Sequence, residues 1–203
     1  MPDVGLILLA AGGSARMGRP KQLLPYEGTT LLRRAAQAAV ASECAPIVVV
    51  TGAVAERCAD ELRGLSSVLV EPNPDWEKGM GTSIRAGLLR LLRERPSVAA
   101  VVIMLCDQPR VEAADLRRLC DIHRATGKGV VASEYAGTLG PPCLFAARWF
   151  VALQSLGDAE GAKRLIQSAK DDCCTAPAPG AALDIDTPDD YEQLGPEGGR
   201  GNT

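Results

Sequence analysis

The sequence predicts an α/β fold built on a mainly parallel sheet, and two alternating patterns support this prediction. Short and nearly continuous apolar runs are typical of strands that are covered on both faces. These runs are Leu6–Leu9, Ile47–Val50, Val68–Val70 and Val98–Leu105. Between them lie segments whose apolar residues recur about three and four apart, as in helices that pack one face on a sheet. These segments are Leu31–Ala41, Ala53–Leu62, Ser83–Leu92 and Ala113–Arg124. This order favours parallel strands joined by right-handed helical crossovers.

The pattern loosens after Gly127. We expect two further strands, Val130–Ala132 and Cys143–Phe145, on either side of a turn-prone segment from Gly137 to Pro142. A helix is predicted from Asp158 to Lys170, followed by a loop at the proline-rich residues 176–180.

The C-terminal stretch "ALDIDTPDDY" predicts a short strand that ends at acidic residues and a helix with Pro188 at its first position. Residues 195–203 are polar and rich in glycine, and we expect a flexible tail. Residues 1–194 are expected to form a single domain, because 203 residues are enough for one large core and few for two.

Composition excludes several classes of function. A net charge of −3 argues against a general surface for nucleic acid or anionic membranes. No stretch approaches the roughly 20 apolar residues of a membrane span, and no signal peptide is apparent, so we expect a cytoplasmic protein. The seven cysteines are scattered without a C-x-x-C pair, which favours structural thiols. The only histidine, His123, is expected at the surface of a helix.

The loop after the first apolar run has the composition of an anion site. Small residues, Ala10-Ala11-Gly12-Gly13-Ser14, let backbone amides approach a phosphate chain, and Arg16, Arg19 and Lys21 follow. A polyphosphate would satisfy both the amides and the cations, whereas the alternative is a solvated glycine-rich connection. The loop matches neither the Walker A pattern nor the G-x-G-x-x-G fingerprint.

Two acidic segments are candidates for a metal site. Asp107 follows the most apolar run and precedes the strand-ending Pro109. A carboxylate at this edge of a sheet suits Mg²⁺, which binds few protein groups and bridges substrate phosphates. Asp184 and Asp186 form the second segment. The alternatives are that Asp107 caps a turn and that Asp186 or Thr187 caps a helix.

These motifs resemble those of a known family. The stretch "LAAGGSARMGRPKQLLPYEGTTLL" is similar to the signature L-A-[AG]-G-x-S-x-R-[ML]-G-x-x-K of the MobA-like nucleotidyltransferase superfamily. Later stretches are most similar to molybdenum cofactor cytidylyltransferases, namely "NPDWEKGMGTSIRAGL", "LCDQP", "GPPCLF", "GDAEGAKRL" and "DIDTPDDY". The resemblance covers about residues 4–193.

The resemblance implies a Rossmann-like nucleotidyltransferase fold and an enzyme that transfers CMP from CTP to the phosphate of molybdopterin or molybdenum cofactor, with Mg²⁺ and release of pyrophosphate. It also implies a recipient molybdoenzyme or its chaperone as a partner. Carried over residue by residue, it implies a nucleotide site at Leu9, Ala10, Ala11, Gly12, Gly13, Arg16, Lys21, Asn73, Gly79, Met80 and Ser83. Catalysis is assigned to Arg16, Lys21 and Asp107, the metal to Asp107 and Asp186, and the acceptor side to Pro142, Asp184 and Asp186.

One departure leaves the acceptor open. Many relatives have Gly-His-Pro where this chain has Gly140-Pro141-Pro142, so a contact made by that histidine is missing. Ala10-Ala11-Gly12 favours CTP over GTP, because guanylyltransferases tend to have Ala-Gly-Gly there. The alternatives are another phosphorylated acceptor or a GTP donor, and a non-catalytic module that binds a nucleotide or cofactor as a chaperone.

Overall fold

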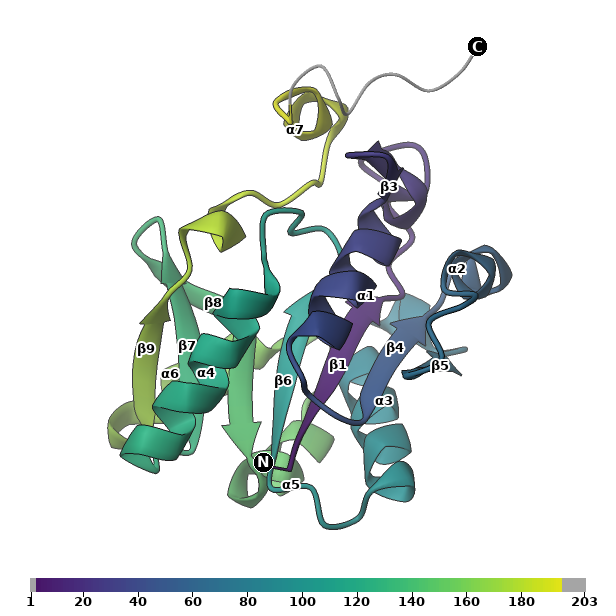
Figure 1. The fold of residues 1–203 in the computed structure, drawn as a ribbon. Helices are drawn as coiled ribbons and strands as arrows, with labels where there is room; N and C mark the ends of the chain where they lie inside the picture. The colour runs from purple at the N-terminus through teal and green to yellow at the C-terminus, as the bar shows by residue number, and fades with distance from the viewer. Residues whose placement is uncertain (1–2, 195–203) are drawn as a thin grey trace.

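The computed structural model describes residues 3–194 and has a seven-stranded sheet at its centre (Figure 1). The strand order is β5-β4-β1-β6-β8-β7-β9. The strands are β1 (Val4–Ala10), β4 (Ile47–Thr51), β5 (Val68–Pro72), β6 (Ala100–Leu105), β7 (Val130–Tyr135), β8 (Thr138–Ala146) and β9 (Cys173–Pro177), and β2 (Pro25–Tyr26) pairs with β3 (Thr29–Thr30) as a separate hairpin. The predicted α/β class with a mainly parallel sheet is confirmed.

The central strands are parallel, as their continuous apolar sequences predict. Strand β1 is buried along its whole length and pairs in parallel with β4 on one side and β6 on the other. Strand β8 is antiparallel to both β6 and β7, and β9 is parallel to β7. The carboxyl ends of β1, β4, β5 and β6 therefore meet at one edge of the sheet.

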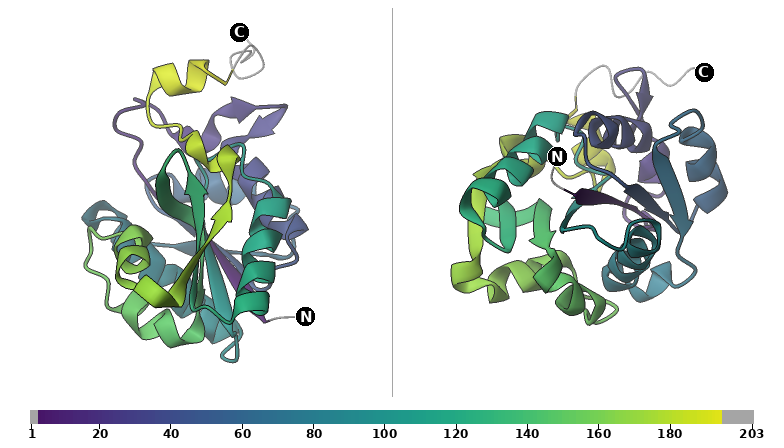
Figure 2. Two further views of the ribbon diagram at one scale, coloured as in Figure 1. Left: turned by 90° about the vertical axis from the view of Figure 1, so that its left-hand side faces the viewer. Right: turned by 60° about the horizontal axis from the view of Figure 1, so that its bottom comes forward.

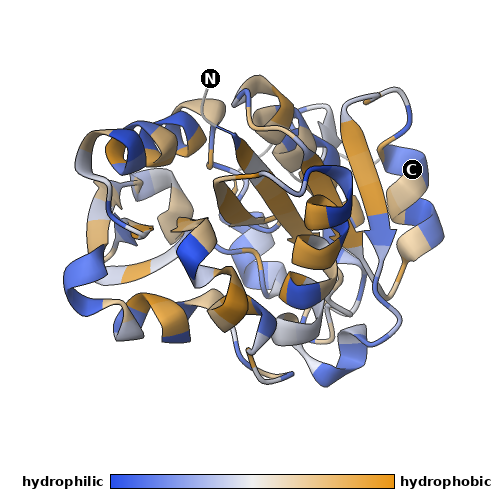
Figure 3. Ribbon diagram, turned by 90° about the horizontal axis from the view of Figure 1, so that it is seen from below, coloured by the Kyte–Doolittle hydropathy of each residue, from blue (hydrophilic) through white to orange (hydrophobic). Residues whose placement is uncertain are grey.

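Helices cover both faces of this sheet (Figure 2). They are α1 (Leu31–Ala41), α2 (Ala55–Glu61), α3 (Met80–Glu94), α4 (Ala113–Thr126), α5 (Phe150–Gln154), α6 (Ala162–Ser168) and α7 (Pro188–Glu192). Alternate residues of β1 serve the two faces. Leu6 and Leu8 pack with α1, α2 and α4, whereas Ile7 and Leu9 pack with α3, α5 and α6. Figure 3 shows hydrophobic strands at the centre of the molecule, surrounded by helices in which polar and apolar residues alternate. Within residues 3–194, no helix is long and apolar enough to cross a membrane.

A third, smaller apolar cluster fixes the C-terminal segment above the carboxyl edge of the sheet. Ile185 and Tyr191 pack with buried residues of the N-terminal segment, and the Tyr191 hydroxyl donates to the Pro25 carbonyl over 2.6 Å. Their buried partners are Met17, Leu24, Tyr26 and Leu31. The segment around Ile185 is consequently held beside the loop that follows β1 (Figure 1).

The structure differs from the predictions mainly after residue 130. Strand β8 runs through part of the expected turn at 137–142, because the ladder shifts between Ala132 and Ser133. Pro141 and Pro142 lie between the paired residues Gly140 and Cys143, so their missing amide hydrogens cost no ladder bond. The proline-rich stretch expected as a loop begins within β9, an edge strand that tolerates proline.

Three further boundaries differ. The expected helix at 158–170 is the shorter α6, because residues 157–161 form a turn on the start of α3, where the Gly81 amide donates to the Asp158 carbonyl. Helix α3 begins at Met80 rather than Ser83. Residues 183–186 form no strand, since Ile185 lies beyond the sheet in the third cluster. The predicted flexible tail, residues 195–203, lies outside the described residues.

Candidate active site

The loop after β1 is folded back by a buried glutamine that sequence reasoning missed. Gln22 is 1% exposed, and its side-chain amide donates to the carbonyls of Ala10 and Gly12 at 3.0 and 2.6 Å. The Ser14 hydroxyl accepts from the Lys21 amide at 3.0 Å, which closes the loop at its far end. The sequence offered one hint of this role, namely that Gln22 directly follows Lys21 of the glycine-rich motif.

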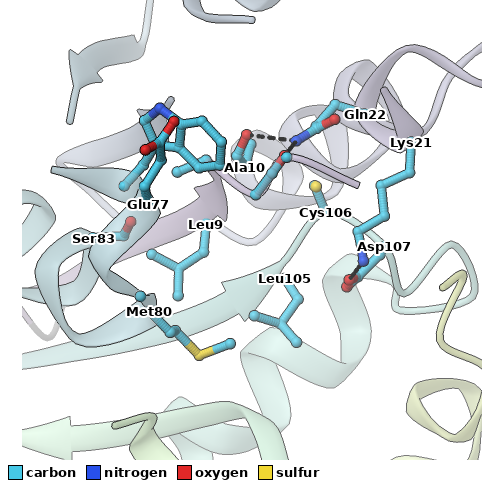
Figure 4. Close-up of a pocket in the computed structure, with 15 residues that line it drawn as sticks. Leu9, Ala10, Lys21, Gln22, Glu77, Met80, Ser83, Leu105, Cys106 and Asp107 are labelled. Atoms are coloured by element: carbon cyan, nitrogen blue, oxygen red, sulfur yellow. Dashed lines mark hydrogen bonds and ion pairs between the residues drawn. The ribbon is translucent and has the colours of Figure 1, made fainter. Parts of the chain in front are cut away.

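The loop lines a pocket of about 290 Å³ at the carboxyl edge of the sheet. Ten of the predicted site residues lie around it: Leu9, Ala10, Ala11, Gly12, Gly13, Lys21, Gly79, Met80, Ser83 and Asp107. Five further residues that were not predicted complete the lining, namely Gln22, Trp76, Glu77, Leu105 and Cys106. Figure 4 shows Lys21 and Asp107 at one end of the pocket, whereas Glu77, Met80 and Ser83 lie at the other.

Trp76 forms one wall of this pocket and explains two of the glycines. A β-carbon at Gly13 would lie 2.8 Å from the indole ring, and one at Gly52 would lie 2.7 Å from it. Both distances are shorter than a carbon contact allows, so the ring fits against the backbone only because these residues lack side chains. The aromatic surface thus extends the apolar floor made by Leu9 and Leu105.

Asn73 has a supporting position rather than the predicted place in the pocket. It is 4% exposed, is not among the described residues that line the pocket, and donates to the hydroxyls of Thr82 and Ser83 at 2.8 and 2.9 Å. Its own side-chain oxygen accepts from the Asp75 amide. Asn73 therefore fixes the first turn of α3, which presents Ser83 to the pocket.

Charged residues from three distant segments meet at the end of the pocket near β6. The Lys21 ammonium group lies 2.5 Å from Asp107 Oδ2 and 2.8 Å from Asp186 Oδ1. Arg16 forms an ion pair with the other Asp186 oxygen at 2.8 Å. The Lys21 and Asp107 side chains are each 15% exposed, whereas Arg16 is 71% exposed and lies outside the pocket lining. The structure brings the predicted cations together with the predicted metal ligands.

This cluster shifts the ionisation of its members. Burial lowers the pKa of Lys21, but the charge and hydrogen bonds of Asp107 and Asp186 outweigh that effect and raise it above its ordinary value. The hydrogen bond from Lys21 lowers the pKa of Asp186. Lys21 and Asp186 are therefore both charged near neutral pH. Asp107 Oδ1 is buried and has no hydrogen-bond partner among the described residues, so one carboxylate oxygen remains available.

The predicted acceptor side lies next to this cluster. Burial and the negative charge of Asp107 raise the pKa of Asp184. Pro142 is buried, and its carbonyl accepts from the Ser133 hydroxyl at 2.6 Å. The amide of Gln108 donates to Pro141 and Ala181, while its oxygen has no partner within the part of the chain described. Pro142 thus supports the β7–β8 hairpin. Asp184 is the residue of this set whose ionisation the negative charge of Asp107 influences.

The histidine and the cysteines other than Cys106 are not among the described residues that line the pocket. His123 is half-buried on α4, with Nδ1 2.7 Å from the Lys128 carbonyl oxygen, so it is a packed helix residue rather than an exposed one. All seven cysteines are free thiols, and five of them are buried, as expected for structural thiols.

The comparisons with known proteins agree with this geometry. Backbone amides and cations gathered beside one apolar pocket suit a nucleoside triphosphate, and the fold and site define the class as a nucleotidyltransferase. Within that class, the family model described as the MobA-like NTP transferase domain matches residues 6–173, and the chain belongs to that family. The resemblance found in the sequence is confirmed.

Several relatives are similar over most of the chain. A protein of Paenarthrobacter nicotinovorans named nicotine blue oxidoreductase is 35% identical over 70% of this chain, which spans 66% of that protein. The molybdenum cofactor cytidylyltransferase of Escherichia coli is 25% identical over 94% of this chain and 95% of its own length. The crystal structure of Rv0371c from Mycobacterium tuberculosis H37Rv superposes with a TM-score of 0.81 at 31% identity, covering 95% and 97% of the two chains. A manganese complex of the same protein has a TM-score of 0.75 at 30% identity, covering 95% of this chain and 97% of the other.

Proposed function

We propose that this protein transfers CMP from CTP to the phosphate of a pterin-type acceptor such as molybdopterin or molybdenum cofactor, with release of pyrophosphate. The observation that carries the proposal is the meeting of Lys21, Asp107 and Asp186 at one end of a pocket lined by a glycine-rich loop. The named activity of the E. coli relative supports the acceptor and the donor. The product would pass to a recipient molybdoenzyme or its chaperone.

The residues present fit a divalent cation. Mg²⁺ commonly uses one or two carboxylates, and substrate phosphates and water supply its other ligands. Asp107 has a buried oxygen without a partner among the described residues. Asp186 contacts the same Lys21 ammonium group that contacts Asp107. Asp107 and Asp186 would hold the ion, which when bound neutralises phosphate charge. The manganese complex of the Mycobacterium relative supports a metal of this kind.

Transfer of CMP to a phosphate requires that the acceptor and the nucleotide are aligned and that their negative charge is neutralised. It requires no nucleophile from the protein. An oxygen of the acceptor phosphate attacks the α-phosphorus of the nucleotide, and the bond from that phosphorus to the leaving pyrophosphate breaks. Gly12 and Gly13 line the pocket, where their amides would bind phosphate oxygens, and Lys21 and Arg16 would supply positive charge. Burial and the charge of Asp107 raise the pKa of Asp184, and this residue would face the acceptor.

We assign the choice between a cytosine and a guanine base to the part of the pocket away from Lys21 and Asp107. Ala11 is 6% exposed and lines the pocket, and Trp76 forms the adjoining wall. A methyl group at residue 11 narrows the space for a purine, so we propose CTP as the preferred donor over GTP. Glu77 and Ser83 offer polar groups at the same end for the edge of the base.

A single acceptor screen tests this proposal. Purified protein is incubated with each of the four NTPs, with Mg²⁺ and with molybdopterin, a sugar phosphate, a polyol phosphate or no acceptor, while pyrophosphate is measured. We expect release that requires molybdopterin and is fastest with CTP. Release with another acceptor or with GTP would identify a different transferase. Nucleotide binding without pyrophosphate in any combination would indicate a binding module or the redox activity named for the Paenarthrobacter relative.

A further inference from the structure

A single ammonium group fills the space between the two carboxylates proposed to hold the metal ion. Lys21 Nζ donates to Asp107 Oδ2 at 2.5 Å and to Asp186 Oδ1 at 2.8 Å. These carboxylates come from segments far apart in the sequence, and Lys21 is the group that joins them (Figure 4 shows its contact with Asp107). A cation held by the same two oxygens would have to take the place of Nζ.

The contact with Lys21 leaves one oxygen of Asp107 without a hydrogen bond among the described residues. Lys21 contacts Oδ2, while Oδ1 is buried without a hydrogen-bond partner in the described part of the chain. A buried acceptor without a donor is costly, so the arrangement with Lys21 is not the best one available to Asp107. A metal ion or its water shell is able to satisfy both oxygens, whereas a lysine at one of them does not.

The same lysine also faces the pocket. It lines the cavity together with Gly12 and Gly13, so a triphosphate bound there offers it new negative partners. Its long side chain has enough rotatable bonds to leave the carboxylates without moving the backbone. A divalent ion and an ammonium group repel each other, and the Lys21 and Asp107 side chains, each 15% exposed, leave little room for both.

We propose that Lys21 occupies the Asp107–Asp186 gap until a metal–triphosphate complex arrives, and then moves from the carboxylates to the phosphates. This inference rests on the proposed function, and it names the ligand of the site as the complex of metal and triphosphate rather than either part alone. Metal and triphosphate consequently bind with positive cooperativity. By reciprocity of linkage, each raises the affinity of the other by the same factor.

Arg16 provides the contrast that separates this exchange from a general effect of charge. It pairs with Asp186 at 2.8 Å, yet its side chain is 71% exposed and does not lie between the two carboxylates. Removal of Arg16 deletes the same charge as removal of Lys21 but leaves the gap filled. Lys128 serves as a second control, since it lies at the turn between α4 and β7 and contacts the Asp171 carbonyl there.

The test measures binding of Mn²⁺ by electron paramagnetic resonance, first with the protein alone. We expect Lys21→Met to bind Mn²⁺ about tenfold more tightly than the wild type, Lys128→Met to match the wild type, and Arg16→Met to gain much less than Lys21→Met. Lys21→Gln is measured in parallel, and melting temperatures identify any variant that fails to fold. Equal or weaker Mn²⁺ binding by both Lys21 variants, or an equal gain in Arg16→Met, would overturn the proposal.

The second half of the test adds inorganic tripolyphosphate, which has no base and therefore does not depend on the choice of CTP. In the wild type we expect it to tighten Mn²⁺ binding about tenfold more than it does in Lys21→Met. An equal effect in both proteins would mean that Lys21 stays on the carboxylates, and the exchange would be wrong. Loss of CMP transfer with normal cooperativity would instead contradict the proposed function alone.

Discussion

The side-chain amide of Gln22 donates to the carbonyl of Gly12 over 2.6 Å and, through the same nitrogen, to that of Ala10 over 3.0 Å. The glycine-rich loop is thus tied to the end of β1 by one buried side chain. Replacement by leucine would leave both carbonyls without this donor, and an unsatisfied buried group costs about 1–3 kcal/mol.

We therefore expect Gln22→Leu to lower the free energy of unfolding by about 2 kcal/mol and to weaken triphosphate binding more than tenfold. Urea unfolding and nucleotide titration measure the two effects. Gln167→Leu, at an exposed position of α6, is the control and should leave both unchanged. Unaltered nucleotide binding by a folded Gln22→Leu protein would show that the loop holds its shape without this residue.

A second prediction concerns Asp107. Asn keeps the size of this side chain but removes its charge, so Asp107→Asn should lower turnover by roughly two to three orders of magnitude, the scale of one preorganised electrostatic group. Pyrophosphate release is measured across a Mg²⁺ titration, with the melting temperature as the check on folding. Near-normal turnover would favour the alternative that Asp107 caps a turn, because Asn is an equally good cap.

Ala11 provides a prediction about base choice. Its methyl group is 6% exposed at the pocket wall, so Ala11→Gly widens the space for a purine. We expect the ratio of kcat/KM for CTP over GTP to fall about tenfold in this variant, an effect of the size that one methyl group in a pocket produces. Equal turnover of CTP and GTP by the wild type would reject the role of Ala11 from the start.

A fourth prediction concerns stability against pH at the other end of the sheet. Asp172 accepts hydrogen bonds from Arg148 at 2.6 Å, from the Trp149 indole at 2.8 Å and from the Gly129 amide at 2.8 Å. The hydrogen bond from Arg148, followed by that from Trp149, lowers the pKa of Asp172 well below its ordinary value of 3.8.

A carboxylate whose pKa is lower in the folded state stabilises that state above its unfolded pKa and loses this effect as the pH falls. Asp172→Asn should therefore lower the melting temperature at pH 7, and the difference from the wild type should shrink as the pH drops below 3.8. Asp171→Asn, at the exposed neighbouring residue, is the matched control. A difference that stays constant down to acid pH would assign the effect to geometry rather than to charge.

Local sequence patterns determine the parallel half of the sheet. The strands of the parallel half were predictable because burial on both faces leaves a continuous apolar sequence, and β1 is buried throughout. The meeting of Lys21 with Asp107 followed from the rule that ligands bind at the carboxyl edge of such a sheet. Asp186 reaches the same place for a different reason, since the residue beside it, Ile185, anchors in an apolar cluster instead of a strand.

Other features depend on tertiary neighbours that no local pattern reveals. Asn73 belongs to a motif that the family resemblance places near the nucleotide, and the sequence alone does not distinguish a residue that lines the pocket from one that holds Ser83 in place. Gln22 and Trp76 were missed because glutamine is mostly exposed in proteins and no local pattern marks this one for burial, or this indole for a pocket wall. Their partners, Gly12 for the amide and Gly52 for the ring, become visible only when the chain has folded.

The last prediction tests the anchor at Ile185. This residue is fully buried in the small cluster with Tyr191, and its amide donates to the Asp107 carbonyl over 3.0 Å. Ile185→Ala would leave a cavity, and we expect a loss of about 2 kcal/mol in the free energy of unfolding, the lower end for such a change because the cluster is small.

Activity should suffer more than stability in Ile185→Ala, because Ile185 precedes Asp186 and determines how that carboxylate reaches Lys21. We expect at least a tenfold fall in turnover under conditions where urea unfolding shows the variant to be folded, together with weaker Mn²⁺ binding in the presence of tripolyphosphate. Val111→Ala is the control, since Val111 is also buried, at 3% exposed, but packs in the large cluster rather than in the small cluster that holds Ile185. If both variants lost stability and activity in the same proportion, the C-terminal segment would contribute to the fold alone. If only Ile185→Ala lost activity, the anchor would be a positioning residue that acts through Asp186.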